Sequence, residues 1–480
     1  MKIFLFGFDG LRPDCITEKT MPNVFRFLQS NIQFTNHHAV FPSETYVNHP
    51  SIFTGFMPYR HGLVANAFFE PAWSRTQFFV GNSVEKVEAV EKATAGSLFE
   101  VPTVLETLES QGKTMLSVSS NSSGSTRLMA HKAQLYHSVN ISTCGLRYAI
   151  PKELGERFGS DPQDGKYPRP DIPGLRKVNE IVNHLFSEQG IPDLSVIWYG
   201  EPDNAFHAFG IGSEQAKAAM KAADECFAQI VSAWADEQTY IIVASDHGHI
   251  TVEKHFDINS ALENQGFVFA KEKLPEGNED FTSLWGYSGN IYVREPKLVV
   301  PIVEALQAMD EIGMLFTRDR NGLQGVAPGT FSQSLVGGEH RRAGDIRYTL
   351  RTSDSKDEHG YSGLCSCPEG IHVGSSIHGG LHKKEMQALL GIGGPGCKKY
   401  TEFSQPTSMI DIMPTVYALL GVEPCMPVQG RILAEVLKGN DAPGEMRPKK
   451  LEVAHKGYRQ VLKLNQVSGI PYLISGKRIG

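Results

Sequence analysis

The sequence predicts an α/β protein with a mostly parallel central sheet, helices on both faces of that sheet, and an inserted cap. Four short apolar runs bounded by turn residues are typical of buried parallel strands, at residues 2–10, 114–120, 193–200 and 239–248. Helical patterns lie between or beside these runs, at residues 21–30, 101–112 and 213–237. Because strands that alternate with helices form βαβ units, the pattern indicates one sheet covered by helices on both faces.

Composition narrows the classes of function. Hydrophobic residues make up 41% and charged residues 21% of the 480 residues, which is typical of an ordinary soluble globular protein. The net charge of -7 offers no basic surface for a nucleic acid polymer. Seven cysteines, an odd number in a long chain, do not indicate a disulfide framework.

The first apolar run is too short to direct secretion. It extends from Ile3 to Gly7 and is interrupted by Asp9, whereas a signal peptide needs a longer apolar region and a small-residue cleavage site. No stretch reaches the length of a transmembrane helix. These observations predict a cytoplasmic protein without a membrane partner.

Three segments depart from the α/β pattern. Residues 155–175 are rich in Gly, Pro and charge and are expected to form a surface loop. Residues 270–300 and 317–377 are loop-rich, with strand-like runs at 289–295 and 344–351, and the α/β pattern resumes at 413–422. We therefore predict a core at 1–254 and 376–440, a cap at 255–375 and a C-terminal extension at 441–480.

Acidic and histidine residues follow three of the predicted strands. Asp9 ends the first, Asp203 and His207 follow the third at i and i+4, and Asp246 and His247 end the fourth. One such aspartate is usually a turn or helix-capping residue. Three strand ends at the same sheet edge, where α/β proteins bind ligands, indicate a site.

The residue types at this edge suit metal ions. Carboxylate oxygens and imidazole nitrogens together are typical ligands of zinc. The ligand candidates are too many for one ion, and two adjacent ions form a clamp for in-line displacement at phosphorus. The sequence therefore predicts two divalent cations, with zinc as the favoured metal.

Five segments resemble one known family, in the same order along the chain. Residues 41–66 (FPSETYVNHPSIFTGFMPYRHGLVAN) resemble the nucleophile segment of the nucleotide pyrophosphatase/phosphodiesterase family, within the alkaline phosphatase superfamily. The other four are EPDNAFHAFG (201–210), SDHG (245–248), IHGG (377–380), and MPTVYALLGV (413–422) followed by QGRIL (429–433). Each motif alone is weak, and it is their shared order that is specific.

The resemblance implies a role for each residue of the site. Asp203, His207 and His378 would hold one metal ion, and the second would be held by the residues Asp9, Thr45, Asp246 and His247. Thr45 would be the nucleophile, activated by the metal, and would form a covalent intermediate. Asn66 and the Thr45 backbone N–H would hydrogen-bond a non-bridging oxygen of the substrate.

The substrate expected is a small phosphorus ester. No arginine beside Thr45 is evident to clamp a monoester dianion, which favours diesters. Glu44 would repel a highly anionic nucleotide. Three cap arginines, Arg341, Arg342 and Arg347, are candidates for binding anionic substrates.

Other interpretations stay open. A phosphonoacetate-hydrolase-like enzyme would share the threonine, the asparagine and the metal ligands, and would need a lysine for the substrate carboxylate, from among Lys86, Lys92, Lys113 and Lys132. A metal-dependent phosphomonoesterase or sulfatase-like enzyme is another alternative, although a sulfatase would carry Cys or Ser in place of Thr45. An inactive phosphate-binding protein is the alternative that is not an enzyme. We expect His249 and His255 to lie behind the ligands or on the surface.

Overall fold

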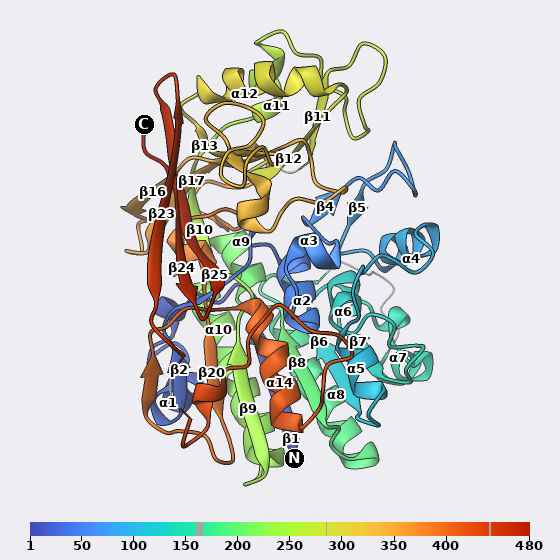
Figure 1. The fold of residues 1–480 in the computed structure, drawn as a ribbon. Helices are drawn as coiled ribbons and strands as arrows, with labels where there is room; N and C mark the ends of the chain where they lie inside the picture. The colour runs from blue at the N-terminus through green and yellow to red at the C-terminus, as the bar shows by residue number, and fades with distance from the viewer. Residues whose placement is uncertain (160–166, 285, 441–442) are drawn as a thin grey trace.

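A central eight-stranded sheet organises the molecule in the computed structural model, which describes residues 1–159, 167–284, 286–440 and 443–480 (Figure 1). The strand order is β21-β2-β20-β9-β1-β8-β6-β7, and β9, β1, β8, β6 and β7 are parallel. The strands are β1 Lys2–Phe8, β2 Ile32–Phe34, β6 Met115–Ser119, β7 Val139–Ser142, β8 Leu194–Tyr199, β9 Thr239–Ala244, β20 Leu390–Gly393 and β21 Thr401–Phe403. All four runs predicted as strands are therefore strands of this sheet.

The register of the sheet brings three strand ends to one level. Gly7 of β1 is paired with Trp198 of β8 on one side and with Ala244 of β9 on the other. Asp9, Gly200 and Asp246 therefore follow strands that end side by side, with β1 in the middle. This edge is where the sequence predicts the metal ions.

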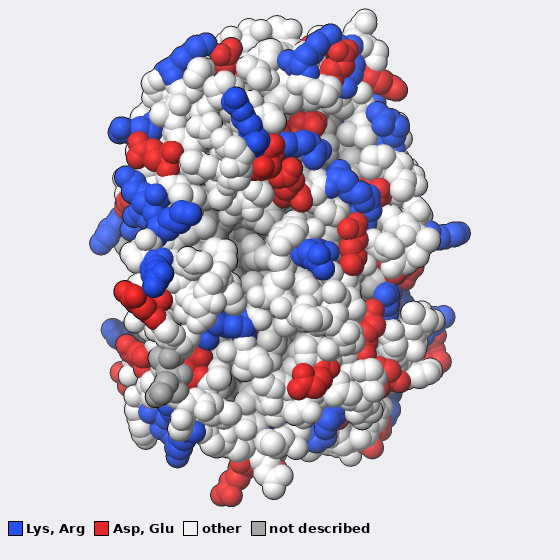
Figure 2. Space-filling model, viewed as in Figure 1, with Lys and Arg blue, Asp and Glu red and all other residues white. Residues whose placement is uncertain are grey.

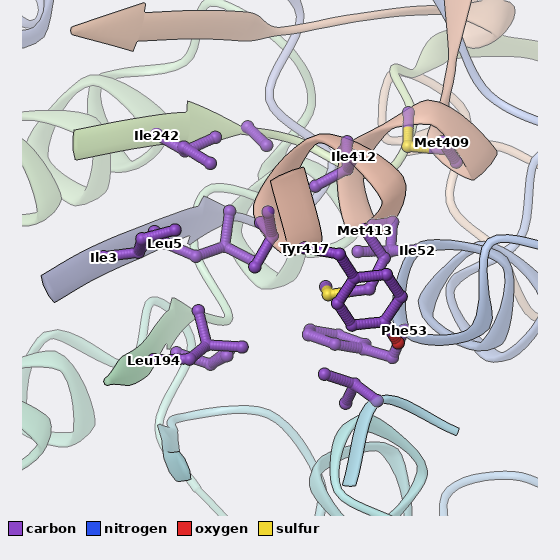
Figure 3. Packing of buried hydrophobic residues seen from close by; sticks show 14 of the residues in the cluster. Ile3, Leu5, Ile52, Phe53, Leu194, Ile242, Met409, Ile412, Met413 and Tyr417 are labelled. Atoms are coloured by element: carbon purple, nitrogen blue, oxygen red, sulfur yellow. The ribbon is translucent and has the colours of Figure 1, made fainter. Parts of the chain in front are cut away.

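Side chains of β1 alternate between two helical layers. Ile3 and Leu5 belong to a core with α2 (Thr45–Thr54), α5 (Val104–Glu109) and α14 (Ile412–Leu420), of which Figure 3 shows the part around Met413 and Tyr417. On the other face, phenylalanines of β1 pack with α1 (Pro22–Ser30), α8 (Ile172–Gln189) and α10 (Glu214–Trp234). Burial on both faces explains why β1 is a nearly continuous apolar run.

The predicted surface loop at 155–175 is wrong at both ends. α7 (Lys152–Phe158) enters it, and α8 begins inside it at Ile172. The side chain of Asp171 caps α8 by accepting a hydrogen bond of 2.9 Å from the Gly174 N–H, and a proline follows at the first turn. Both are start signals of a helix that the Gly- and Pro-rich composition concealed. Residues 160–166 lie outside the described residues.

Residues 250–377 build two further sheets above the core (Figure 1). One has the order β11-β12-β15-β13-β14, with β11 Phe281–Leu284, β12 Ser288–Val293, β13 Ile312–Thr317, β14 Phe331–Ser332 and β15 Ile346–Leu350. The other has the order β16-β17-β10-β18, with β10 Ile250–His255, β16 Thr352–Lys356, β17 Ser362–Cys367 and β18 Ser376–Ile377. The strand-like runs at 289–295 and 344–351 correspond to β12 and β15.

The C-terminal residues form a three-stranded antiparallel sheet, with β23 Arg447–His455, β24 Tyr458–Val467 and β25 Ile470–Arg478. Gln460 of β24 accepts from the N–H of Leu315 and donates to its carbonyl, both at 2.9 Å. The C-terminal sheet is thereby hydrogen-bonded to β13. The division into core, cap and extension stays a prediction.

The remaining helices of the described residues are short. They are α3 Pro58–His61, α4 Val84–Ala93, α6 Ser123–Met129, α9 Asp203–Phe209, α11 Ile258–Glu263, α12 Val299–Gln307 and α13 Lys383–Met386.

Within the part of the chain described here, no helix combines the length and apolarity needed to cross a bilayer. Figure 2 shows basic and acidic side chains interspersed on one face. The cellular location stays a prediction.

Candidate metal centre

Asp9, Asp246 and His247 converge at the ends of β1 and β9, and we call them the strand-end cluster. Their ligand atoms lie within 4.8 Å of one another, and all three residues are buried. The Nε2 atom of His247 is 3.6 Å from Oδ1 of Asp9 and 3.3 Å from Oδ2 of Asp246. The fold thus brings together residues that are 237 positions apart in the sequence, Asp9 and Asp246.

Within the described residues, two oxygens of this cluster accept no hydrogen bond, although imidazole Nε2 atoms lie 3.3–3.6 Å away. Oδ1 of Asp9 and Oδ2 of Asp246 are buried without a hydrogen-bond donor. Burial, together with the charges of Asp246 and Asp203, raises the pKa of Asp9 well above its usual value, and burial also raises the pKa of Asp246. Buried carboxylates are normally paired or bind a metal. The unpartnered oxygens therefore fit a cation.

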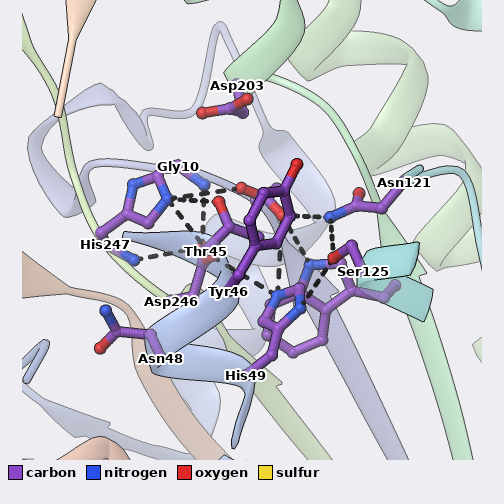
Figure 4. A network of polar contacts seen from close by, with 12 residues as sticks. Gly10, Thr45, Tyr46, Asn48, His49, Asn121, Ser125, Asp203, Asp246 and His247 are labelled. Carbon is purple, nitrogen blue, oxygen red and sulfur yellow. Dashed lines mark hydrogen bonds and ion pairs between the residues drawn. The ribbon is translucent and has the colours of Figure 1, made fainter. Parts of the chain in front are cut away.

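The other carboxylate oxygens are fixed by neighbours (Figure 4). Oδ2 of Asp9 accepts from the amide of Asn121 and, at 3.2 Å, from Nε1 of Trp198. Oδ1 of Asp246 accepts from the N–H of Gly10 at 3.1 Å. A Cβ on Gly7 would lie 2.0 Å from the Trp198 ring, so only glycine leaves room for that indole. Bonds of this kind orient metal ligands.

Thr45 lies against the strand-end cluster. It is the first residue of α2, and its Oγ1 is 3.1 Å from Nε2 of His247. No hydrogen bond of the described residues uses the Thr45 N–H, because this position precedes the helical hydrogen-bond pattern. A hydroxyl and a free N–H at a helix N-terminus suit an anionic group.

Asp203, His207, His249 and His378 lie close together, and we call them the outer cluster; ligand atoms of Asp203, His249 and His378 lie within 4.8 Å of one another and of His247. The Nε2 atoms of the three histidines lie 3.4, 2.8 and 3.6 Å, in that order, from Oδ1 of Asp203. Asp203 and His207 come from the first and fifth residues of α9, so the i, i+4 spacing places both on one helix face.

The charge on Asp203 is stabilised by these histidines. Burial alone would raise its pKa, but the neighbouring His207 and His249 hold the pKa of Asp203 well below its usual value. The Nδ1 atoms of His207 and His378 lie 2.9 Å from the Ser376 carbonyl and 2.8 Å from the Ser43 carbonyl. With Nδ1 occupied, both rings present Nε2 to the centre of the cluster.

His249 lies behind the ligands, which is the first of the two positions expected for it. It is completely buried, with Nε2 at 2.8 Å from Asp203, so a surface position is wrong for this residue. His255 is exposed, with Nε2 2.8 Å from the Ile371 carbonyl. In the described part of the chain, Cys365, Cys367 and His372 belong to no group of possible metal ligands.

Asn66 is oriented by hydrogen bonds to its side-chain oxygen and from its backbone N–H. Its Oδ1 accepts from the Tyr46 N–H at 2.9 Å, so its Nδ2 is the end left for a substrate. Its backbone N–H donates to Glu44 at 2.5 Å. Burial raises the pKa of Glu44 to about 7, although the Asn66 bond and Arg347 act in the opposite direction. Glu44 therefore positions the loop that carries Asn66.

A cavity of about 380 Å³ opens beside the outer cluster, with His207 and His378 in its lining. Core residues Glu44, Asn66, His207, Ile377 and His378 form one side of it, and Gly286, Tyr287, Ser288, Cys367, Pro368, Glu369 and Ile371 form the other. Within the described residues, neither lysine nor arginine lines this cavity.

None of the lysines proposed from the sequence lines this cavity. Lys86 donates to the Phe78 carbonyl, Lys113 pairs with Asp193 and Lys132 pairs with Glu106. No contact of Lys92 with the cavity is found in the described part of the chain.

The cap arginines are also engaged elsewhere. Arg341 and Arg342 both pair with Glu70, at 2.5 and 2.7 Å. Arg347 is buried and donates to the Val64 carbonyl at 3.0 Å. These contacts join the cap to the loop that follows the nucleophile segment.

The arrangement agrees with the comparison to known families. The sequence profile of the type I phosphodiesterase/nucleotide pyrophosphatase family matches residues 3–334, more than half of the chain. The chain belongs to this family. Membership confirms the resemblance found in the short motifs, and the family matches the geometry, since its hydrolysis depends on two metals.

Similarity to single members of the family is distant. Bis(5'-adenosyl)-triphosphatase enpp4 of Xenopus laevis is 34% identical over 85 residues, which cover 18% of this chain and 19% of that protein. Ectonucleotide pyrophosphatase/phosphodiesterase C27A7.1 of Caenorhabditis elegans is 20% identical over 441 residues, 90% of this chain and 44% of that protein. The matched region thus spans less than half of the length of these curated relatives.

Solved structures of family members confirm the fold class. Murine ENPP5 superimposes with a TM-score of 0.63 at 16% identity, over 91% of this chain and 100% of that chain. Human ENPP5 gives 0.64 at 18% identity, over 92% and 100%. An inactive threonine-to-alanine variant of murine ENPP5, in complex with AMP, gives 0.62 at 16% identity, over 91% and 100%.

Proposed function

We propose that this chain is a two-metal phosphodiesterase in which Thr45 attacks phosphorus and forms a covalent intermediate. The observation that carries the proposal is the position of the Thr45 hydroxyl. It lies at a helix N-terminus, 3.1 Å from His247 and next to the unpartnered oxygens of Asp9 and Asp246. A hydroxyl placed among metal ligands is suited to nucleophilic attack.

The residues present fit two cations. Asp9, Asp246, His247 and Thr45 would hold one, and Asp203, His207 and His378 would hold the other, with zinc favoured by the mixed nitrogen and oxygen donors. When bound, the cations would supply Lewis acidity beside Thr45 and positive charge beside the leaving oxygen.

The reaction has two steps at phosphorus. Oγ1 of Thr45 forms a bond to phosphorus as the bond to the leaving oxygen breaks; the hydroxyl proton leaves to solvent, and the leaving oxygen takes up a proton from solvent. Water then attacks the same phosphorus, the bond to Thr45 breaks, and the hydroxyl is regenerated with the proton of that water. The alcohol arm leaves in the first step and the phosphomonoester in the second.

Asn66 and the Thr45 N–H stabilise the charge that moves onto a non-bridging oxygen. Nδ2 of Asn66 is the free end of a side chain whose Oδ1 is held by the Tyr46 N–H. Preorganised donors of this kind are worth about 3–4 kcal/mol each in acyl-transfer enzymes.

The cavity beside the outer cluster accommodates one arm of the diester. Its cap side contributes Tyr287, Pro368 and Ile371, and the charged side chains that line it are Glu44 and Glu369. Such a wall favours an uncharged or apolar arm and disfavours a polyphosphate. This composition supports a diester with an uncharged arm rather than phosphonoacetate.

A panel of substrates tests the proposal. It contains bis-p-nitrophenyl phosphate, p-nitrophenyl phosphate, phosphonoacetate and diadenosine triphosphate, the last because enpp4 is named for that class. We expect the highest kcat/KM for bis-p-nitrophenyl phosphate. A preference for the monoester or for phosphonoacetate would replace the phosphodiesterase assignment with the corresponding alternative.

A further inference from the structure

We propose that His249 is a fourth protein ligand of the cation held by Asp203, His207 and His378. The inference rests on the proposed function only in that a cation must bind to the outer cluster. It departs from the three-ligand set that the family resemblance implies.

The three histidines are arranged alike around one oxygen. Their Nε2 atoms lie 2.8 Å (His249), 3.4 Å (His207) and 3.6 Å (His378) from Oδ1 of Asp203. Ligand atoms of a tetrahedral zinc site with bonds of roughly 2.0–2.1 Å are about 3.3–3.4 Å apart. His249 therefore needs a shift of only about half an ångström to reach the same separation as the other two.

The rings also surround a common centre. Ring centroids of His207, His249 and His378 are mutually 4.8, 4.9 and 5.1 Å apart. The Nδ1 atom of His249 is 3.1 Å from the hydroxyl of Ser376, whose carbonyl holds Nδ1 of His207. A hydroxyl can accept from Nδ1–H, and Nε2 is then free to donate its electron pair to a metal.

The backbone explains why this histidine reaches the cluster. β10 begins at Ile250 and pairs with β18 antiparallel, with Ile250 opposite Ile377. His249 and His378 are thus the residues that leave the two strands side by side, at the end nearest α9. The same strand pair therefore places both histidines side by side, so that a metal ion bound by His378 lies within reach of His249.

The space for His249 depends on Gly10. Gly10 has a φ of +65°, and a Cβ there would lie 2.6 Å from Nε2 of His249 and 3.0 Å from Oδ1 of Asp203. Glycine at this position keeps the imidazole and the carboxylate in contact. His249 has no exposed surface, so its ring serves the interior of the site rather than solvent.

The alternative role of His249 is a hydrogen bond that only orients Asp203. Ligation predicts a different chemistry for the cation, because four protein ligands leave fewer positions for water or for the leaving oxygen. His249→Gln separates the two roles, since glutamine can still donate a hydrogen bond to Asp203 but is a poor zinc ligand.

The experiment uses the full chain loaded with Co²⁺, with bound metal measured by emission spectroscopy and coordination by visible absorption. The wild type, His249→Gln, His207→Gln and His255→Gln are compared. His255→Gln is the matched control, because this exposed histidine receives the same substitution outside the clusters. We expect His249→Gln and His207→Gln each to change the visible absorption bands of bound Co²⁺. Each should also lower the affinity for one of the two cations by at least about a hundredfold.

The visible bands decide the outcome. Wild-type bands in His249→Gln, with or without weaker binding, would overturn ligation and leave His249 as a residue that orients Asp203. Failure of the proposed function is distinguishable, because the wild type would then bind fewer than two cations and His207→Gln would leave the bands unchanged.

Discussion

The strand-end cluster and the outer cluster use the same residue types but are built differently. Asp9, Asp246 and His247 stand at the ends of adjacent core strands, and within the described residues two of their carboxylate oxygens accept no hydrogen bond. In the outer cluster, Asp203 already accepts from buried imidazoles, and the side chain of His207 is 29% exposed toward the cavity. The first cluster is rigid and short of positive charge, whereas the second is internally paired and open.

This difference supports the proposed division of the reaction between the two clusters. A nucleophile needs a fixed position, and Thr45 is anchored at the start of α2 beside the closed cluster. A leaving group needs an exit, and the outer cluster borders the cavity. The comparison can be broken by variants that remove the nucleophile, a ligand of either cluster, a cavity charge or a single buried carboxylate.

The largest effect is expected for Thr45→Ala. Because the covalent step is lost while the carboxylate and imidazole ligands remain, turnover should fall by roughly three or more orders of magnitude with most of the metal retained. Thr45→Ser should keep partial activity, and Thr76→Ala, in an exposed loop, should match the wild type. Mass spectrometry of acid-quenched enzyme should detect a phosphoryl adduct on Thr45, and wild-type rates in Thr45→Ala would leave only direct attack by water.

The next effect concerns one ligand from each cluster. Asp246→Ala and His378→Ala should each lower bound metal and reduce kcat/KM by at least about a hundredfold, because an incomplete ligand set holds the ion poorly. Emission spectroscopy measures the metal content, and exposed His359→Ala is the control. Full metal occupancy with unchanged turnover in both variants would contradict the assignment of both clusters.

The strand-end cluster could be predicted from sequence because its signals are local. An apolar run, a turn and an aspartate mark the ends of β1 and β9, and parallel strands must end at a common edge. The same reasoning reached Asp203 and His207 through their i, i+4 spacing. Trp198, by contrast, belongs to an apolar run and is indistinguishable in sequence from a core residue, although its indole N–H holds Asp9.

Residues whose roles depend on distant pairing could not be predicted. His249 reaches Asp203 only because β10 pairs with β18, a contact across 127 residues in the case of His249 and Ser376. The sequence suggested that the cap arginines bind an anion, but Arg342 forms an ion pair with Glu70, which is 272 residues away. Asn121 had a weak local signal, since it follows directly after the predicted strand 114–120.

A smaller effect is expected from the cavity. Glu369→Lys replaces one of the two negative charges that line the cavity with a positive charge. It should lower KM for diadenosine triphosphate by a few-fold and leave KM for bis-p-nitrophenyl phosphate nearly unchanged. Glu358→Lys, an exposed cap residue outside the cavity lining, is the matched control. Equal KM changes for both substrates would show that the cap wall does not select the arm of the diester.

The smallest effect is expected for the stability of the metal-free protein. It tests whether the carboxylates of the strand-end cluster repel one another when no cation is bound. Burial and the neighbouring carboxylates raise the pKa of Asp9 well above its unfolded value. A raised pKa means that the folded state binds the proton more tightly, so the stability from this group is present at low pH and is lost as pH rises through the folded pKa. Ionisation of Asp9 in the folded metal-free chain is therefore opposed by burial and by repulsion from Asp246, which costs stability at pH 8. Asp9→Asn removes that repulsion.

We therefore expect Asp9→Asn, with metal chelated, to raise Tm at pH 8 by about 1–3 °C and to have a smaller effect near pH 4.5, where less of that stability has been lost. Saturating zinc should reverse the sign at pH 8, because the variant then lacks a ligand and gains less from binding. Differential scanning calorimetry of the wild type and Asp9→Asn under these conditions measures both signs. Asp354→Asn is the control, since the pKa of this aspartate is lowered to about 2 by Lys383 and its removal should not stabilise the protein at pH 8. A Tm gain that does not depend on pH would mean that the unpartnered oxygens of Asp9 and Asp246 do not constitute the charge deficit that the cation fills.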